Sequence, residues 1–167
     1  MSDIQVAPAT PAHLSSILDQ TRVTLQEHRA RNPRAFPPKL MTKLEKRHRA
    51  AVSVELKQPI SFVASLNGAD AGFILLRPVA DMAMIYDIGV FPVFRRQGVG
   101  RELVSHAVSI AQTREWNLLF AAVWDGNEAS HQLFRGSDFI AQRSPFGALA
   151  RFFPKHRVTS YAFKVAP

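Results

Sequence analysis

The chain has 167 residues, of which 47% are hydrophobic, and a formal net charge of +8, which together fit one folded domain over residues 1–167. The absence of cysteine excludes disulfide scaffolds, thiol nucleophiles and cysteine-ligated zinc. No apolar run reaches the roughly 18–20 residues of a membrane span and the N-terminus lacks the pattern of a signal peptide, so we expect a cytoplasmic protein with no membrane partner.

Apolar periodicity and turn residues predict the elements of the chain in order. The N-terminal half is predicted to begin with a strand at residues 4–6 and a helix that starts at Pro11 after a Thr10 cap and has Thr21 on its buried face. A proline-containing loop over 33–38 and a second helix follow. A β-hairpin then has strands at 60–66 and 71–77 around a turn at 67–70. The C-terminal half is predicted to contain a strand at 84–91, a helix after Gly98 and Gly100, a buried strand at 118–124, a short helix that Asn127 caps and that ends near Gly136, and strands at 139–142 and 158–165. The predicted order is therefore β-α-α-β-β-β-α-β-α-β-β.

Most of the positive charge lies in the stretch 22–57, where ten lysines and arginines stand against three glutamates. Such a surplus can attract nucleic acid, acidic lipid, an acidic substrate or the phosphates of a cofactor, or it can be a solvated helical face with a basic loop. Phe36 is the one residue among Phe, Tyr and Trp in this stretch, so it lacks the aromatic platform of a nucleic-acid surface and we expect no nucleic-acid partner. His28 and His48 also fall here and are interpreted as surface residues, and no histidine spacing predicts a metal site.

The most informative stretch is residues 95–100, Arg-Arg-Gln-Gly-Val-Gly, between a predicted strand and a helical pattern. Glycine lets the backbone approach an anion closely, and the unpaired N–H groups of a first helical turn favour negative charge. The stretch is no kinase-type phosphate loop, because no Gly-Lys-Ser/Thr follows, and no dinucleotide fingerprint, because the third glycine is missing. A purely structural turn is the alternative, but it would not need the flanking cations Arg95, Arg96 and Arg101. The stretch therefore predicts a phosphate cradle.

The segment from Ile88 to Phe139 resembles the acetyl-CoA-binding core of the GNAT superfamily of N-acetyltransferases. Residues 95–100 fit that family's Gln/Arg-x-x-Gly-x-Gly/Ala motif, residues 88–92 fit the strand before it, and residues 122–139 fit its later strand–Asn–helix–Phe pattern. The resemblance implies a single-domain α+β fold with a mixed, mostly antiparallel sheet and helices on both faces. It also implies an enzyme that moves an acetyl group from acetyl-CoA to a primary amine of a small molecule, protein or peptide, by direct attack in a ternary complex and without a metal.

The same resemblance assigns the contacts to coenzyme A. Backbone N–H groups of residues 96–101 would hold the pyrophosphate, and backbone groups of Ile88 and Val90 would pair with the pantetheine arm like an added strand. The Val90 N–H would also polarise the thioester carbonyl, a contact that contributes about 3–4 kcal/mol to lowering the barrier. Asn127 would meet the cofactor near its thiol end or act only as a helix cap. The full set of expected cofactor-binding residues is Ile88, Val90, Arg95, Arg96, Gln97, Gly98, Val99, Gly100, Arg101, Asn127 and Phe134.

Two positions depart from the pattern of the family. Many members have a tyrosine seven residues after the asparagine, which protonates the leaving thiolate, and here that position is Phe134. The usual Gly-Phe ending is also altered, because Asp138 precedes Phe139 and the helix-ending glycine is Gly136. A thiol is a good leaving group near neutral pH, so water can supply the proton instead. The departures keep a second hypothesis open, a catalytically weak or inactive CoA-binding regulatory module of the same fold.

The general base must take a proton from an ammonium group, directly or through water. Asp87 and Tyr86 lie on the strand that would flank the acetyl group, and strand alternation predicts that one of the two reaches the acceptor cavity. Asp87 is the favoured base, and the alternative is that it is an ordinary strand carboxylate paired with an arginine. Asp125 and Glu128 are further candidates for the base, but they also fit a turn residue and a helix-start residue. The predicted catalytic residues are Asp87, Tyr86 and Val90.

The parts of the chain that would bind the acceptor contain the fewest recognisable motifs. In this family the first two helices and the last strands line the acceptor cavity, so the basic stretch 22–57 hints at an acidic acceptor or partner rather than a polycation. The loop 146–153 has three interpretations: a wall of the acceptor site, a contact in a homodimer, or a packed loop that closes the edge of the sheet.

Overall fold

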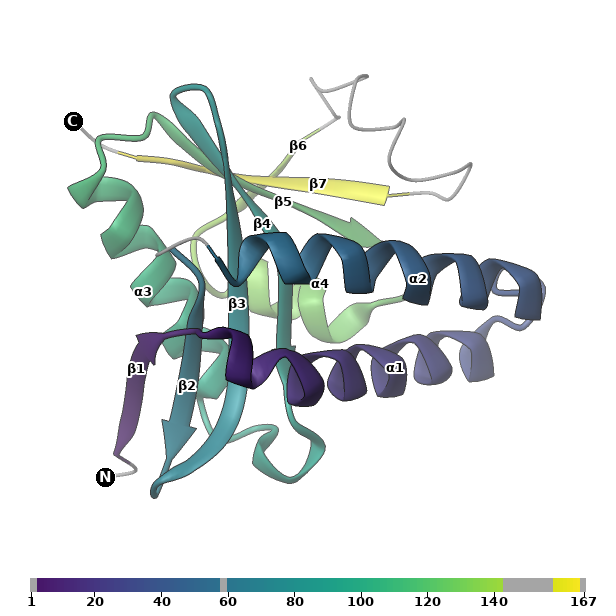
Figure 1. Ribbon diagram of the computed structural model, residues 1–167. Coiled ribbons are helices and arrows are strands. Elements are labelled where there is room, and N and C mark those ends of the chain that lie inside the picture. Colours follow the sequence, from purple (N-terminus) through teal and green to yellow (C-terminus); the bar gives the residue numbers. More distant parts are fainter. Residues whose placement is uncertain (1–2, 58–59, 143–157, 166–167) are drawn as a thin grey trace.

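The computed structural model describes residues 3–57, 60–142 and 158–165, and their elements follow the predicted order (Figure 1). The strands are β1 (Ile4–Pro8), β2 (Phe62–Leu66), β3 (Ala69–Val79), β4 (Met82–Val90), β5 (Leu118–Trp124), β6 (Ile140–Gln142) and β7 (Val158–Lys164). The helices are α1 (Leu14–Arg31), α2 (Pro38–Glu55), α3 (Val99–Thr113) and α4 (Glu128–Arg135), with 3-10 turns η1 (Pro11–His13) and η2 (Pro92–Phe94). The predicted loop at 146–153 lies outside the described residues.

The seven described strands form one sheet in the order β1-β2-β3-β4-β5-β7-β6. Neighbouring strands are antiparallel except for β4 and β5, which are parallel, so the expected mixed and mostly antiparallel sheet is confirmed. The predicted hairpin joins β2 and β3 at Asn67 and Gly68, whose φ angles of 53° and 82° are left-handed values that a two-residue hairpin turn favours.

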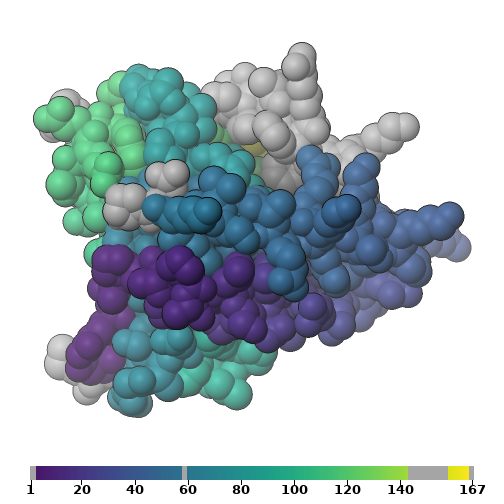
Figure 2. Space-filling view, in the orientation of Figure 1, coloured from purple at the N-terminus to yellow at the C-terminus, as the bar shows by residue number. Residues whose placement is uncertain are grey.

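Helices cover both faces of the sheet, as expected. α1 and α2 lie side by side across the face that Figure 1 and Figure 2 present to the viewer, and α3 and α4 pack on the opposite face. Alternation along β3 serves both layers, because Phe73 and Leu75 pack with α1 and α2 while Ile74 and Leu76 pack with α3. In the part of the chain that the structure describes, no helix combines the length and the apolar character that crossing a bilayer takes.

β4 and β5 pair over only part of their length. Their ladder runs from Met82 opposite Leu118 to Ile85 opposite Ala121 and stops there. β4 nevertheless stays paired with β3 as far as Val90, and β5 stays paired with β7 as far as Trp124. The second half of β4 therefore has an open edge inside the sheet, and this opening positions the site.

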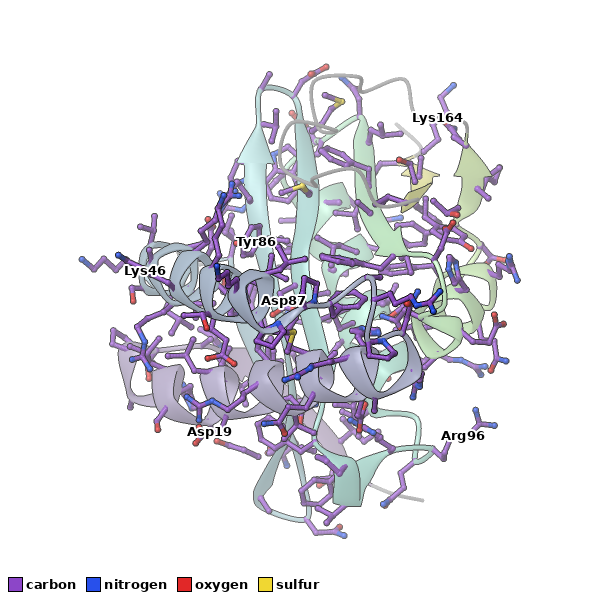
Figure 3. The ribbon with its side chains drawn as sticks, turned by 90° about the vertical axis from the view of Figure 1, so that its right-hand side faces the viewer. Asp19, Lys46, Tyr86, Asp87, Arg96 and Lys164 are labelled. Carbon is purple, nitrogen blue, oxygen red and sulfur yellow. The ribbon has the colours of Figure 1, made fainter. Side chains whose placement is uncertain are left out.

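A β-bulge interrupts β4 at Tyr86. Leu75 pairs with Asp87 and Leu76 with Ile85, so Tyr86 is the extra residue on its strand. The bulge turns two successive side chains toward the same helices: Tyr86 and Asp87 both contact a residue of α2 and lie together behind α1 and α2 in Figure 3. The prediction that alternation would send only one of the two toward the acceptor side is therefore wrong.

An ion pair fixes the end of α2 to the sheet. The carboxylate of Glu55 accepts from Arg77 Nη2 at 2.6 Å and from Arg77 Nε at 2.7 Å, and the Glu55 side chain is only 4% exposed. The same guanidinium lies 4.1 Å from the centre of the Tyr86 ring. Charge as well as apolar packing thus sets the position of α2 relative to the bulge of β4.

Candidate active site

A cavity of about 360 Å³ opens where β4 and β5 separate. Side chains from α1, α2, β3, β4, β5 and α4 line it, and the lining includes both Tyr86 and Asp87. We call it the acceptor cavity. Because each wall comes from a different part of the chain, the cavity depends on the tertiary fold rather than on any one motif.

The predicted phosphate cradle lies at the start of α3. Gly98 is the N-cap residue with a φ of 89°, and Arg96 also has a left-handed φ of 65°, so the backbone coils tightly before the helix begins. The first helical N–H groups of α3 have no partner within the helix. A Cβ atom on Gly100 would stand 3.4 Å from Leu133 of α4 and 3.5 Å from Val90 of β4. The cradle therefore adjoins the open edge of β4.

The arginines of this turn differ in their surroundings. Arg95 donates from Nη1 to Glu27 Oε1 at 2.8 Å and from Nε to the Val90 carbonyl at 3.3 Å, which ties the turn to α1 and to the end of β4. Arg96 and Arg101 are exposed, and Figure 3 shows Arg96 pointing away from the sheet. Arg95 thus holds the turn in place, whereas the other two leave their charge beside the cradle.

The backbone of Ile88 and Val90 faces the opening. The Phe91 N–H donates to the Ala71 carbonyl at 2.9 Å across the ladder with β3. Successive residues of an antiparallel strand send their N–H and C=O groups to alternate sides, so those of Ile88 and Val90 point away from β3. The Ile88 N–H also hydrogen-bonds the Asp87 carboxylate, and this bond partly offsets the rise in the pKa of Asp87 that burial causes.

Asp87 lies in a cluster with Thr21 of α1 and His48 of α2. His48 Nε2 is 3.2 Å from Asp87 Oδ2 and 2.9 Å from Thr21 Oγ1, and the Thr21 hydroxyl donates to Asp87 Oδ2 at 3.3 Å. Burial raises the pKa of Asp87 above its ordinary value of 3.8, against smaller lowering effects of His48, Thr21 and the Ile88 N–H. The side chain that pairs with Asp87 is thus a histidine and not the arginine that we weighed as an alternative.

His28 and His48 are both half-buried rather than fully exposed, which corrects their interpretation as surface residues. The His48 side chain is 14% exposed and stacks on Tyr86 with ring centres 6.1 Å apart. His28 stacks on Phe36, which stacks on Trp124, and burial lowers the pKa of His28. The sequence around His48 does contain a pattern that predicts its burial, although many basic residues surround it. His48 is flanked by Leu44 and Val52 at i, i+4 spacing, which places it on the buried face of α2.

α4 closes the far side of the acceptor cavity. Asn127 accepts a hydrogen bond from the Ser130 N–H at 3.3 Å, which confirms its helix-cap interpretation, and its side chain also lines the cavity. Phe134 is 2% exposed and stacks on the fully buried Tyr161, whose hydroxyl lies 2.8 Å from His131 Nδ1. The hydroxyl of the tyrosine that stacks on Phe134 is therefore buried and already paired.

The other acidic candidates lie outside the lining of the acceptor cavity. Asp125 accepts from the Thr159 hydroxyl at 3.5 Å, and Glu128 is exposed in the first turn of α4. Among the described residues, no group of three or more His, Asp or Glu side chains is arranged to hold a metal ion. Of the carboxylates weighed as a base, Asp87 is the one in the cavity.

Replacing Asn127 with alanine should lower the free energy of unfolding by about 1 kcal/mol, because α4 would lose its side-chain cap. Thermal unfolding of the variant measures this loss. Asn127→Asp keeps an accepting oxygen and serves as the control, with a midpoint close to that of the unmodified protein. Equal midpoints for the alanine and aspartate variants would show that the cap contributes nothing measurable.

A comparison with models of protein families matches residues 22–139 to the acetyltransferase (GNAT) family. The chain belongs to this family. The matched range runs from α1 through the phosphate cradle and the end of α4 to Phe139. The GNAT resemblance drawn from residues 88–139 is thereby confirmed and extended to both helices that cover the acceptor cavity.

Similar proteins include N-acetyltransferases. The ribosomal protein bS18-alanine N-acetyltransferase of Escherichia coli K12 is 31% identical over 80 residues, which cover 48% of this chain and 54% of that protein, so the match spans about half of the relative's length. The crystal structure of the E. coli enzyme has a TM-score of 0.66 at 21% identity, over 99% of this chain and 96% of that one. The PaiA N-acetyltransferase from Thermoplasma acidophilum, solved in complex with coenzyme A, has a TM-score of 0.75 at 12% identity, over 96% and 99%. These structures confirm the GNAT fold.

Proposed function

We propose that this GNAT protein transfers an acetyl group from acetyl-CoA to a primary amine by direct attack in a ternary complex. One observation carries the proposal. The carboxylate of Asp87 lies in the acceptor cavity, next to the open edge of β4 that leads to the phosphate cradle of α3. A base, a strand edge for a thioester arm and an anion site are thus aligned in one opening.

Acetyl-CoA, when bound, supplies an activated acetyl group as a thioester. The N–H groups at the start of α3 bind the pyrophosphate, and the exposed Arg96 and Arg101 add long-range attraction. The backbone groups of Ile88 and Val90 pair with the pantetheine arm. The Val90 N–H donates to the thioester oxygen as negative charge develops there. A relative in fold that is solved with coenzyme A supports this use of the site.

The chemical step needs few groups from the protein. The acceptor's ammonium group gives one proton to the Asp87 carboxylate, and the amine nitrogen then bonds to the acetyl carbon. As the carbon–sulfur bond breaks, the nitrogen loses a second proton to water and leaves a neutral amide. The thiolate takes its proton from water, because Phe134 has none to give. Arg47 and Arg77 line the cavity together with Asp87, which fits an acceptor that carries an acidic group near its amine. An N-terminal amine is a candidate, since a similar enzyme is named for acetylating a ribosomal protein alanine.

Phe134 favours a second candidate function, a CoA-responsive regulatory module. It stands at the family's proton-donor position, and the hydroxyl of Tyr161, which stacks on Phe134, is buried against His131. Such a module would bind acetyl-CoA and use the bound state as a signal, without turnover.

A two-stage experiment separates these functions. Calorimetry measures the binding of acetyl-CoA, and a thiol reagent then follows the release of coenzyme A with a panel of amines that includes spermidine, an aminoglycoside and peptides with free N-terminal alanine. Binding with amine-dependent thiol release is the expected result. Binding without thiol release on any amine would assign the regulatory module, and failure to bind acetyl-CoA would refute both.

A further inference from the structure

A second cavity lies on the outer side of the cluster formed by Thr21, His48 and Asp87. Its volume is about 260 Å³, and we call it the outer cavity; its lining consists of Leu18, Thr21, Arg22, Thr42, Glu45, Lys46, His48 and Arg49. It lies between α1 and α2, on the side where Figure 3 shows Lys46 reaching outward. The acceptor cavity and the outer cavity share two lining residues, Thr21 and His48. These two side chains therefore lie between the half-buried carboxylate of Asp87 and the outer cavity.

We propose that His48, assisted by Thr21, carries the proton that Asp87 takes from the acceptor amine out to solvent in the outer cavity. This inference rests on the proposed acetyltransferase function. The protons balance in three transfers. The ammonium group gives one to the Asp87 carboxylate, the resulting carboxylic acid gives it to His48 Nε2, and His48 Nε2 gives one through the Thr21 hydroxyl to water in the outer cavity. Asp87 and His48 thereby return to their starting charges for the next turnover.

The contacts of His48 suit a relay. Its Nε2 atom is within 3.2 Å of both Asp87 Oδ2 and Thr21 Oγ1, so one short step joins the carboxylate to the ring. Stacking on Tyr86 at an interplanar angle of 8° holds the ring in this orientation. Burial raises the pKa of Asp87 above its ordinary value, which helps this carboxyl to hold the proton before it passes to the ring.

Charged side chains surround the cluster of Thr21, His48 and Asp87 on both sides. On the outer side, Arg22, Lys46 and Arg49 stand against Glu45. On the inner side, Arg47 and Arg77 face the cluster, Glu55 pairs with Arg77, and the Tyr86 phenol has a pKa that burial raises further above its ordinary value of 10.0. The outer side therefore carries an excess of positive charge, with Glu45 as the one carboxylate among its lining residues. A bound acceptor and acetyl-CoA would also block the inner route to water.

Replacing His48 with glutamine tests the relay. With the amine of the panel that turns over fastest, kcat should fall about 10- to 100-fold, while the acetyl-CoA dissociation constant stays unchanged. His106→Gln is the matched control, because His106 is half-buried on the opposite face of the sheet, against Phe62 at 4.4 Å between ring centres. The control should keep the kcat of the unmodified protein.

Chemical rescue distinguishes proton transfer from a structural role. Imidazole and substituted imidazoles should restore part of the kcat of His48→Ala, with a rate that depends on the pKa of the added base. Thr21→Val should lose activity severalfold and Thr21→Ser should keep it, because only the valine variant lacks the hydroxyl. A His48→Gln variant with full kcat, or rescue that does not vary with the pKa of the imidazole, would overturn the relay. Absence of amine-dependent turnover in the unmodified protein would overturn the proposed function, and the relay with it.

Discussion

The Asp87→Asn variant is expected to lose about 10²- to 10⁴-fold in kcat/KM, the range that a positioned general base contributes. Asparagine keeps the shape of the side chain and an oxygen that can accept from Thr21 and His48, but it cannot take a proton from the amine. The acetyl-CoA dissociation constant should stay unchanged. Steady-state thiol release and calorimetry measure the two quantities.

The same variant has a predicted signature in pH dependence. Because the general base must be ionised, the acid limb of kcat/KM should lie above pH 3.8, in the direction of the raised pKa of Asp87, and it should vanish in Asp87→Asn. A raised pKa in the folded state means that the protonated carboxyl favours folding. That contribution is complete below the unfolded pKa and is lost as the pH rises through the folded pKa. At neutral pH the asparagine variant should therefore be at least as stable as the unmodified protein.

A surface aspartate provides the control for this prediction. Asp70 lies in β3, its side chain is 47% exposed, and its Oδ2 atom is 4.0 Å from His13 Nε2. Asp70→Asn should leave both kcat/KM and its acid limb in place. Full activity of Asp87→Asn would show that the base is not Asp87, and a large loss of thermal stability would show that the carboxylate is structural.

The Gly100→Trp variant is expected to bind acetyl-CoA at least about 100-fold more weakly, a loss of about 2.7 kcal/mol. A Cβ atom at Gly100 meets Leu133 and Val90 at ordinary contact distances, and the backbone there does not have a positive φ. The helix can therefore accept a side chain, but an indole ring would occupy the gap beside β4 that the cofactor needs. Gly98 is a poorer probe, because its φ of 89° would strain any substitution whether or not a ligand binds there.

Calorimetry with acetyl-CoA checks this second prediction, and thermal unfolding checks that the variant folds. Ile140→Trp serves as the matched control, since Ile140 is 69% exposed on β6 and lies away from α3. The control should bind acetyl-CoA as the unmodified protein does. Unchanged affinity in Gly100→Trp would place the pyrophosphate somewhere other than the start of α3.

Local sequence signals predicted the helices and strands of this protein and the phosphate cradle, which is one half of its candidate site. The glycines and arginines of residues 95–100 lie in one short turn, and the cap of α4 depends on Asn127 and Ser130, three residues apart. Hydrophobic periodicity is equally local, so the order of strands and helices could be predicted from neighbouring residues alone. The family model confirms the GNAT assignment that these signals carried.

The residues of the acceptor cavity could be identified only from the tertiary structure. Thr21, His48 and Asp87 come from α1, α2 and β4, and no local pattern joins positions so far apart in the chain. The bulge at Tyr86 depends on the register between β3 and β4, which reverses the prediction that simple alternation makes. The sequence by itself thus determined the fold family and predicted the phosphate cradle, because both depend on adjacent residues. Only the packing of two helices over a bulged strand decided that Asp87 meets a histidine rather than an arginine, and that this histidine separates the acceptor cavity from the outer cavity.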